Sequence, residues 1–296
     1  MARNTLNRLR KRYKYARWRL KLRAWHNFSG EERRGLQDLA RRVDSFRIAR
    51  LYAVGKDGLL YDGVWRTTPD EPHILKVSLN KGRRRQEFAR VHRVVEEAHL
   101  PFLCRAPEFG VGEEDPDYWY QIQRKVGGMM VSRYLQLPPR KRLAICDPVG
   151  LCIDLLEQTQ ALNALRIVAP NVDAENVIIQ ENRSLVRVDL DPYFLVDNGN
   201  LPRYPLRRLF RLLHAALADF EPLWRRRIAA GAMGCDPDAL DDLFRRLRSS
   251  AIYGYDDPSE SRHRRDRLVN PEHCFTNVEE PLGLLRAIAE SFQTAP

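Results

Sequence analysis

The chain has 296 residues, a formal net charge of +11, 44% hydrophobic residues and 30% charged residues. This length and composition predict a folded protein with a sizeable core, and they exclude a peptide-sized scaffold or a wholly disordered chain. Five cysteines without a C-x-x-C pair indicate neither a disulfide framework nor a zinc site. Because there is also no apolar run of about 18 residues, we expect a protein of a reducing, cytoplasmic compartment.

The positive charge is concentrated at the N-terminus. Residues 1–28 hold ten Lys or Arg and no acid, which leaves a formal charge of +1 for residues 29–296. Apolar residues recur at steps of three and four, which predicts an amphipathic helix: Leu6, Leu9, Tyr13, Ala16 and Leu20. Such a basic arm could bind an anionic membrane surface, pack on the body, or bind nucleic acid. The near-neutral body disfavours nucleic acid as a partner.

The body begins with a strand-rich region, which we assign to residues 29–128. Ser29 is a predicted N-cap, followed by a helix at about 30–44. Residues 46–79 alternate apolar and polar side chains and are broken by glycines, which predicts three strands with a glycine turn between the first two. Residues 81–101 then have helical spacing, with Phe88, Val91, Val94 and Val95 on one side, and residues 117–126 are a further strand candidate.

Helical patterns dominate the rest of the chain, which we assign to a second domain over residues 129–296. A long helical stretch over 205–230 and another over 236–250 are among them. The interruption is residues 176–191, which predict two short strands around a polar turn. The chain therefore reads as an α+β protein with a β-rich N-lobe and a helical C-lobe. That order of elements is typical of the bilobal protein-kinase-like fold.

Kinase-like chemistry needs a cation on the nucleotide phosphates and a carboxylate that orients this cation. Lys76 is the candidate cation, because it lies within an apolar strand where an ammonium group needs a partner. A place on an edge strand or on a solvent-facing side would be the alternative. Glu87, on the following helix, is the candidate acid, with Glu96 and Glu97 as rivals.

Oxygen ligands for Mg²⁺ are the second requirement. Asn176 and Asp189 are thirteen positions apart and flank the predicted hairpin, which would bring them to one end. Each could instead cap a turn or a helix. Gly55 and Gly58 belong to a turn that loosely resembles the phosphate-covering loop of kinases, and they are candidate nucleotide contacts. ATP and Mg²⁺ are the expected cofactors.

The segments "APNVDAEN" and "DLD" resemble the catalytic segments of the kinase-like sugar kinases of bacterial lipopolysaccharide core assembly, especially the Kdo kinase group. The resemblance covers about residues 45–225 and extends more distantly to aminoglycoside phosphotransferases. It implies that Lys76 is the phosphate cation and that Asn176 and Asp189 are metal ligands. It also implies that Asp191 is the second acid of the closing element.

Two positions depart from that pattern. Ala169 stands where these kinases have a histidine, and Asn171 stands where they have the catalytic aspartate. An amide cannot accept a proton at neutral pH. Asp173, two residues further on, is a candidate substitute base.

Two functions follow from this pattern. The first is an ATP-dependent kinase that phosphorylates a sugar hydroxyl of a lipopolysaccharide-type glycolipid, with the basic arm on the inner face of the membrane. The second is a pseudokinase that binds a nucleotide or a protein partner without transferring phosphate.

Overall fold

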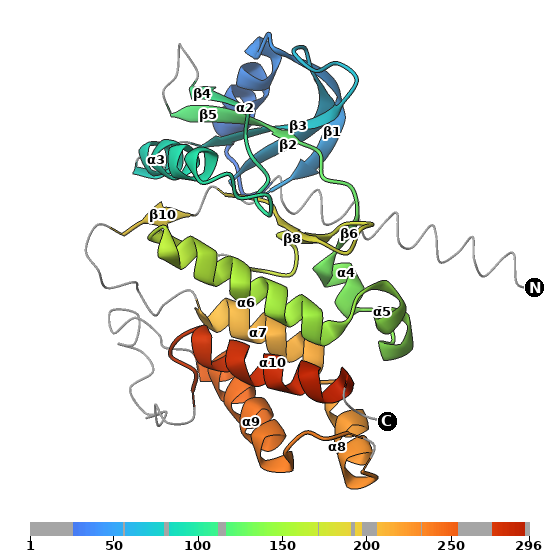
Figure 1. Cartoon of the computed structure of the whole chain (residues 1–296). Helices are drawn as coiled ribbons and strands as arrows, with labels where there is room; N and C mark the ends of the chain where they lie inside the picture. The colour runs from blue at the N-terminus through green and yellow to red at the C-terminus, as the bar shows by residue number, and fades with distance from the viewer. Residues whose placement is uncertain are drawn as a thin grey trace, which may run out of the picture. The chain divides into compact units, whose positions relative to one another are not determined.

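The computed structural model describes residues 26–55, 57–79, 83–111, 117–170, 172–190, 193–196, 206–231, 233–253 and 274–293. They form an α+β fold with a sheet in the N-terminal region and helices in the C-terminal region, which confirms the predicted fold class (Figure 1). Of the predicted arm, residues 1–25 lie outside the described residues. Among the described helices, none is both long and apolar enough to cross a bilayer.

The chain divides into two compact units. The first takes the chain up to Gln86 together with Arg105–Lys125, and the second takes Glu87–Cys104 and everything from Val126 onward. The helix α3 (Arg83–Glu97) therefore begins in the first unit and continues in the second. Its buried apolar residues Phe88, Val91 and Val95 are among those that the helical spacing predicted, whereas Val94 is only partly buried.

The first unit is an antiparallel sheet with one helix across a face (Figure 1). Its elements are α2 (Gly30–Arg42), β1 (Phe46–Val54), β2 (Gly58–Trp65), β3 (Pro72–Leu79), β4 (Glu108–Val111) and β5 (Tyr118–Arg124). The strand order is β1-β2-β3-β5-β4, so β3 is the central strand. Leu36 and Leu39 of α2 share a buried apolar cluster with Leu75 and Val77 of β3. The predicted strands over 46–79 and 117–126 are thus confirmed.

The start of α2 is a capping box, as expected for Ser29. The Ser29 hydroxyl accepts a hydrogen bond from the Glu32 backbone N–H at 3.1 Å. In return, the Ser29 backbone N–H donates to the Glu32 carboxylate at 2.6 Å. These two bonds satisfy amides that the first turn of a helix otherwise leaves without partners, and they fix where the helix begins.

One edge strand of this sheet was not predicted. The strand β4 has only four residues and includes a glycine, so it shows no clear alternation. Polar contacts hold it in place: the Glu108 carboxylate accepts from the Trp65 indole N–H at 2.8 Å and from the Tyr120 hydroxyl at 3.1 Å. The edge is therefore specified by side-chain hydrogen bonds as well as by its ladder with β5.

The second unit is built around helices. Its helices after α3 are α4 (Val131–Leu135), α5 (Pro139–Ile145), α6 (Pro148–Ala164), α7 (Leu206–Leu217), α8 (Glu221–Ala229), α9 (Pro237–Tyr253) and α10 (Glu279–Gln293). The helix α6 packs on α7 and α10, and α7 packs on α9. Leu151, Leu155, Leu156 and Leu162 of α6 are fully buried, as expected for a central helix that contacts neighbours on several sides.

Short strands connect these helices. They are β6 (Met129–Met130), β7 (Ile167–Val168), β8 (Val177–Ile179), β9 (Leu185–Arg187) and β10 (Phe194–Leu195). The pair β8 and β9 is the predicted hairpin, and β6 adds to it as a third strand. The pair β7 and β10 was not predicted, because two residues are too few to show a period.

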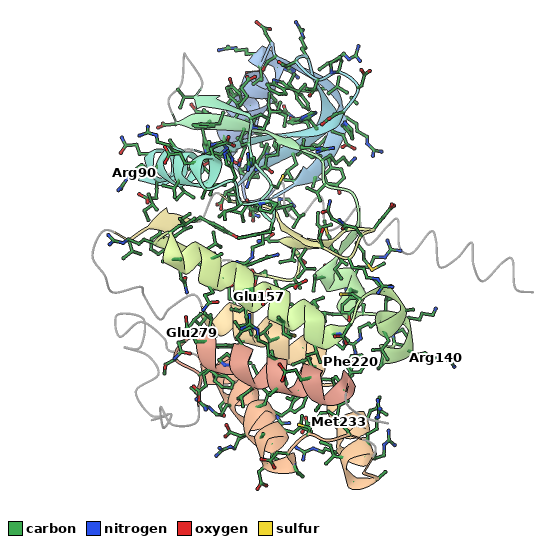
Figure 2. All side chains as sticks on the ribbon, viewed as in Figure 1. Arg90, Arg140, Glu157, Phe220, Met233 and Glu279 are labelled. Atoms are coloured by element: carbon green, nitrogen blue, oxygen red, sulfur yellow. The ribbon has the colours of Figure 1, made fainter. Side chains whose placement is uncertain are left out.

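The helical stretch predicted over residues 205–230 is two helices in the structure. The chain turns between Leu217 and Phe220, which is labelled in Figure 2. The Phe220 backbone N–H bonds to the Leu217 carbonyl at 2.8 Å. Arg142 of α5 is fully buried and forms an ion pair with Asp219 in this turn. Pro222 then lies in the first turn of α8, where the lack of an N–H has no cost. A buried cation from another helix thus favours the break.

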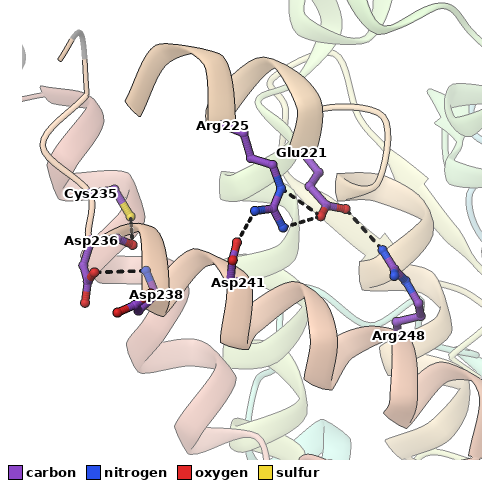
Figure 3. A network of polar contacts seen from close by, with 7 residues as sticks. All are labelled: Glu221, Arg225, Cys235, Asp236, Asp238, Asp241 and Arg248. Atoms are coloured by element: carbon purple, nitrogen blue, oxygen red, sulfur yellow. Dashed lines mark hydrogen bonds and ion pairs between the residues drawn. The ribbon is translucent and has the colours of Figure 1, made fainter. Parts of the chain in front are cut away.

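Exposed charges join α8 to α9 (Figure 3). Arg225 donates to Glu221 at 2.8 Å and also contacts Asp241, while Arg248 donates to Glu221 at 3.4 Å. Because the two arginines are about half exposed, solvent screens these pairs and each adds little to stability.

Candidate functional site

Lys76 lies on the central strand of the first unit. Its neighbours Leu75 and Val77 are fully buried in the cluster with α2, so Lys76 lies on the opposite face by strand alternation. It pairs in register with Leu60 of β2 and Gln121 of β5, and its side chain is partly buried. A place on an edge strand is excluded. A lysine so placed can present a cation from a rigid strand.

The face of the sheet that carries Lys76 holds further polar groups that the sequence did not reveal. Asp62 pairs in register with Ile74, two residues from Lys76. The Asp62 carboxylate accepts from Lys125 Nζ at 2.6 Å and from Arg50 Nη2 at 2.9 Å. Burial would raise the pKa of Asp62, but the hydrogen bonds and charges of Lys125 and Arg50 outweigh it and lower that pKa below its ordinary value.

The predicted glycine turn joins β1 to β2. The Gly55 backbone N–H bonds to the Gly58 carbonyl at 2.8 Å, which closes a tight hairpin. At Gly58, a Cβ atom would lie 2.1 Å from the carbonyl oxygen of Val77 on β3. Glycine is therefore required at position 58 by the close approach of the neighbouring strand. Contacts of Gly55 and Gly58 with a nucleotide stay a prediction.

Glu87 is engaged within the second unit. Its Oε1 accepts a hydrogen bond from the Leu195 backbone N–H of β10 at 2.6 Å, and Arg90 Nη1 lies 3.4 Å from its Oε2. Of the rival acids, Glu96 lies 3.9 Å from His92, and Glu97 is exposed. Lys76 belongs to the first unit, so its pairing with any of these acids stays a prediction.

Asn176 and Asp189 flank the β8–β9 hairpin. The last residues paired across it are Val177 and Arg187, and the Val188 backbone N–H then bonds to the Asn176 carbonyl at 2.9 Å. The backbones at positions 176 and 189 are therefore close neighbours, as the hairpin predicted. Asp189 has φ +67°, in the left-handed region that aspartate tolerates better than most residues and that often occurs at functional positions.

The segment that would carry the base is also in the second unit. Ala169 is buried, and Asn171 lies outside the described residues, as does Asp191. The Asp173 carboxylate pairs with Arg208 of α7 at 2.7 Å. The Asn176 backbone N–H bonds to the Asp173 carbonyl at 2.9 Å, so a tight turn links the two residues. Arg208, which was not singled out from the sequence, thus forms an ion pair with the candidate base, and both side chains are about half exposed.

The donor set at the hairpin suits Mg²⁺ in chemical type. An amide oxygen and a carboxylate are the hard ligands that this ion prefers, and Mg²⁺ normally takes its remaining ligands from water and substrate phosphates. Within the described ranges, no group of three or more His, Cys, Asp or Glu residues is arranged to hold a metal. A dedicated all-protein metal cage is therefore not seen there, whereas a site completed by a nucleotide fits these residues.

Comparison with solved structures shows the fold. The chain is similar to two mutant forms of the kinase domain of Mycobacterium tuberculosis PknI, with TM-scores of 0.51 and 0.52. In both, 14% of aligned residues are identical, and the match covers 83% of this chain and 96% of the kinase domain. No protein-family model and no curated protein matches the sequence.

The fold is thus that of protein kinase domains, which confirms the protein-kinase-like part of the expectation. At this identity the likeness establishes the fold alone. The resemblance to the Kdo kinase group rests on the sequence motifs.

Proposed function

We propose that this chain is an ATP-dependent phosphotransferase of the kinase type that acts on a sugar hydroxyl of a lipopolysaccharide-type glycolipid. One observation carries the proposal: on a kinase fold, Asn176 and Asp189 flank the same hairpin end, with Asp189 in the left-handed conformation. Lys76 on the central strand supports it. The nucleotide would bind as its Mg²⁺ complex.

The reaction would transfer the γ-phosphoryl group of ATP. The hydroxyl oxygen of the acceptor attacks phosphorus, the bond to the ADP oxygen breaks, and the hydroxyl loses its proton. Lys76 would neutralise phosphate charge, and Asn176 and Asp189 would hold Mg²⁺, which supplies further neutralisation of the phosphates. Because Asn171 cannot take the proton, Asp173 or solvent must accept it. Positioning and charge account for most of this catalysis, so a slow reaction remains feasible without an ideal base.

Nucleotide binding is the first test. Lys76→Ala and Asp189→Ala are expected to weaken Mg-ATP binding by at least about tenfold, since each removes one charged contact. Lys141→Ala and Glu181→Ala are matched controls, because both side chains are exposed and Glu181 lies in the turn of the same hairpin. Isothermal titration calorimetry with a non-hydrolysable ATP analogue gives the affinities. Unchanged affinity in both site variants would refute the proposed site.

The acceptor and the membrane are tested separately. We place the enzyme at the inner face of the membrane, where the basic arm of residues 1–28 would bind anionic lipids. Deleting residues 1–25, which keeps the buried Phe28 and the Ser29 cap in place, is then expected to abolish co-sedimentation with anionic vesicles and to leave the melting temperature nearly unchanged. Loss of folding upon deletion would instead support the interpretation that the arm packs on the body. Phosphate transfer from labelled ATP to lipopolysaccharide core glycolipid tests the acceptor.

A second function, that of a pseudokinase, is favoured by the Asp173–Arg208 pair. With Asn171 in the base position, the candidate substitute base Asp173 is itself engaged in an ion pair with Arg208 at 2.7 Å. A pseudokinase would bind a nucleotide and use its surface for a protein partner.

Asn171→Asp separates the two functions. For an enzyme with an impaired base, this change is expected to raise the rate of phosphate transfer by about 10²-fold or more. Arg208→Ala should also raise the rate if Asp173 is the acceptor. Nucleotide binding without any transfer in the parent and in both variants would identify a pseudokinase.

A further inference from the structure

Arg187 is a fully buried cation two residues before Asp189. Its side chain is 1% exposed, and its guanidinium donates to three groups on α6. These are the Gln158 side-chain oxygen at 2.9 Å, the Leu155 carbonyl at 2.8 Å and the Thr159 hydroxyl at 2.7 Å. No acid is among them. Arg187 thus attaches the end of β9 firmly to α6.

A buried guanidinium with neutral partners is costly, because a charge loses its hydration on burial. Burial lowers the pKa of Arg187, and the phenol of Tyr193 opposes this effect through its charge and a hydrogen bond. In the described part of the chain, Nη1 has no hydrogen-bond partner. Burying a hydrophobic residue at this position would cost less free energy than burying an arginine. We therefore asked what else Arg187 does.

The backbone of Arg187 joins a third segment. Its N–H donates to the Phe102 carbonyl at 2.7 Å, and its carbonyl accepts from the Cys104 N–H at 2.8 Å. The residue is therefore bound through its backbone to the chain after α3 and through its side chain to α6. Both belong to the same unit as Asp189. Arg187 is a fixed point from which the next residues extend.

Tyr193, four residues after Asp189, also lies close to Arg187. Burial raises the pKa of the Tyr193 phenol, the guanidinium of Arg187 lowers it, and the Asp189 charge raises it, so both charged groups lie near this phenol. The Tyr193 backbone N–H bonds to the Leu190 carbonyl at 3.0 Å. Tyr193 therefore lies next to Leu190 through its backbone and near Arg187 through its side chain.

We propose that Arg187 is a positioning residue for Asp189, which it fixes by holding β9 on α6 and the Tyr193 phenol across the turn. The backbone at Asp189 is left-handed, and a conformation of higher energy persists only when its surroundings enforce it. The contacts of Arg187 would provide this constraint. The link to metal binding rests on the proposed function. The structural link between Arg187 and the turn does not.

Arg142 offers a matched control. It is also a fully buried arginine of the second unit, but it pairs with Asp219 and lies over the Phe220 ring at 5.0 Å from its centroid. Arg142→Met should therefore destabilise the protein without affecting the turn at Asp189.

The first experiment measures hydrogen exchange in the full chain without nucleotide. In Arg187→Met, we expect the Tyr193 amide to exchange at least about tenfold faster than in the parent, beyond any change caused by global stability. Arg142→Met, compared in denaturant at matched unfolding free energy, should leave this amide as protected as in the parent. Tyr193→Phe removes only the hydroxyl and provides a milder variant if Arg187→Met does not fold. Unchanged protection in the foldable variants would overturn the proposal.

The second experiment compares ATP affinity with Mg²⁺ and with EDTA. A positioning role predicts that Arg187→Met and Tyr193→Phe each reduce the ratio of the two affinities by about tenfold, while affinity in EDTA changes little. Loss of folded protein alone would reduce both affinities together, as expected for Arg142→Met. An unchanged ratio in Arg187→Met and Tyr193→Phe would refute the link to Asp189. If the parent binds no nucleotide at all, the proposed function fails, and the exchange result alone decides the role of Arg187.

Discussion

The sheet of the first unit and the short strands β7, β8, β9 and β10 of the second unit are held in place by different interactions. The long strands around β3 are positioned by apolar side chains that alternate into one cluster with α2. The strands β7 to β10 have only two or three residues each, and polar contacts fasten two of them. The buried Arg187 side chain holds β9 on α6, and the partly buried Glu87 carboxylate holds β10. Lys76 lies on a strand held by hydrophobic burial, whereas Asp189 lies on a turn held by hydrogen bonds. The two candidate site residues should therefore respond to different perturbations.

The largest effect is expected from removing apolar volume behind Lys76. Leu75→Ala leaves a cavity in the cluster with α2 and should lower the free energy of unfolding by about 2–5 kcal/mol. Urea denaturation followed by tryptophan fluorescence measures the change. A cost below about 1 kcal/mol would contradict apolar packing as the main support of this sheet.

A polar contact on the same sheet should matter less and should depend on pH. Asp62→Asn weakens the contacts with Lys125 and Arg50 and is expected to cost about 2 kcal/mol at pH 7. Since folding lowers the pKa of Asp62, its stabilisation is present above the unfolded-state pKa of about 4 and is lost as pH falls through the lower folded-state pKa. The difference between parent and variant in denaturant unfolding should shrink from pH 6 to pH 3. A constant difference would show that the charge is not responsible.

In the second unit, Glu87→Ala tests the fastening of β10. The Leu195 amide loses its charged acceptor, which is worth about 1.5 kcal/mol or more, so its hydrogen exchange should accelerate at least about tenfold. Glu97→Ala, an exposed acid on the same helix, is the control. If the Leu195 amide were equally protected from exchange in the two variants, Glu87 would not be what holds β10.

The capping box of α2 provides a smaller, local test of the first unit. Ser29→Ala removes the acceptor for the Glu32 amide and should cost about 1 kcal/mol in thermal or denaturant unfolding. Ser29→Asp should restore most of it, because aspartate is an equally good N-cap. Failure of aspartate to restore stability would point to a contact other than the cap.

The smallest effect is expected at the exposed network between α8 and α9. Arg225→Ala should change the unfolding free energy by less than about 1 kcal/mol, and the effect should diminish as salt is added. A large, salt-independent loss would mean that the network is less hydrated than the exposure of Arg225 indicates.

The sequence reveals the apolar part of this architecture better than the polar part. Alternation over nine and eight residues located β1 to β3, and the Ser29 cap located α2. The hairpin pattern also placed the backbones at Asn176 and Asp189 together. These features are local, so a single stretch of sequence contains the information.

What the sequence did not reveal depends on partners distant in the chain. The Leu195 amide as partner of Glu87, the contact of Arg208 with Asp173 and the break between α7 and α8 all involve tertiary contacts. Arg187 left a weak signal, namely a cation within the short apolar strand of "SLVRVDL". Such a residue is either exposed or buried with special partners, and only the packing of α6 decides between them.

The backbone at Asp189 has a consequence for how this position would vary under selection. With φ +67°, most side chains are strained by roughly 1–2 kcal/mol, whereas glycine adopts this conformation freely. In a library of substitutions screened only for abundance, glycine and asparagine should therefore be as frequent as aspartate or more so. A second screen for nucleotide retention should deplete glycine and keep aspartate. The contrast between the two screens would separate what the chain requires to fold from what it requires to work.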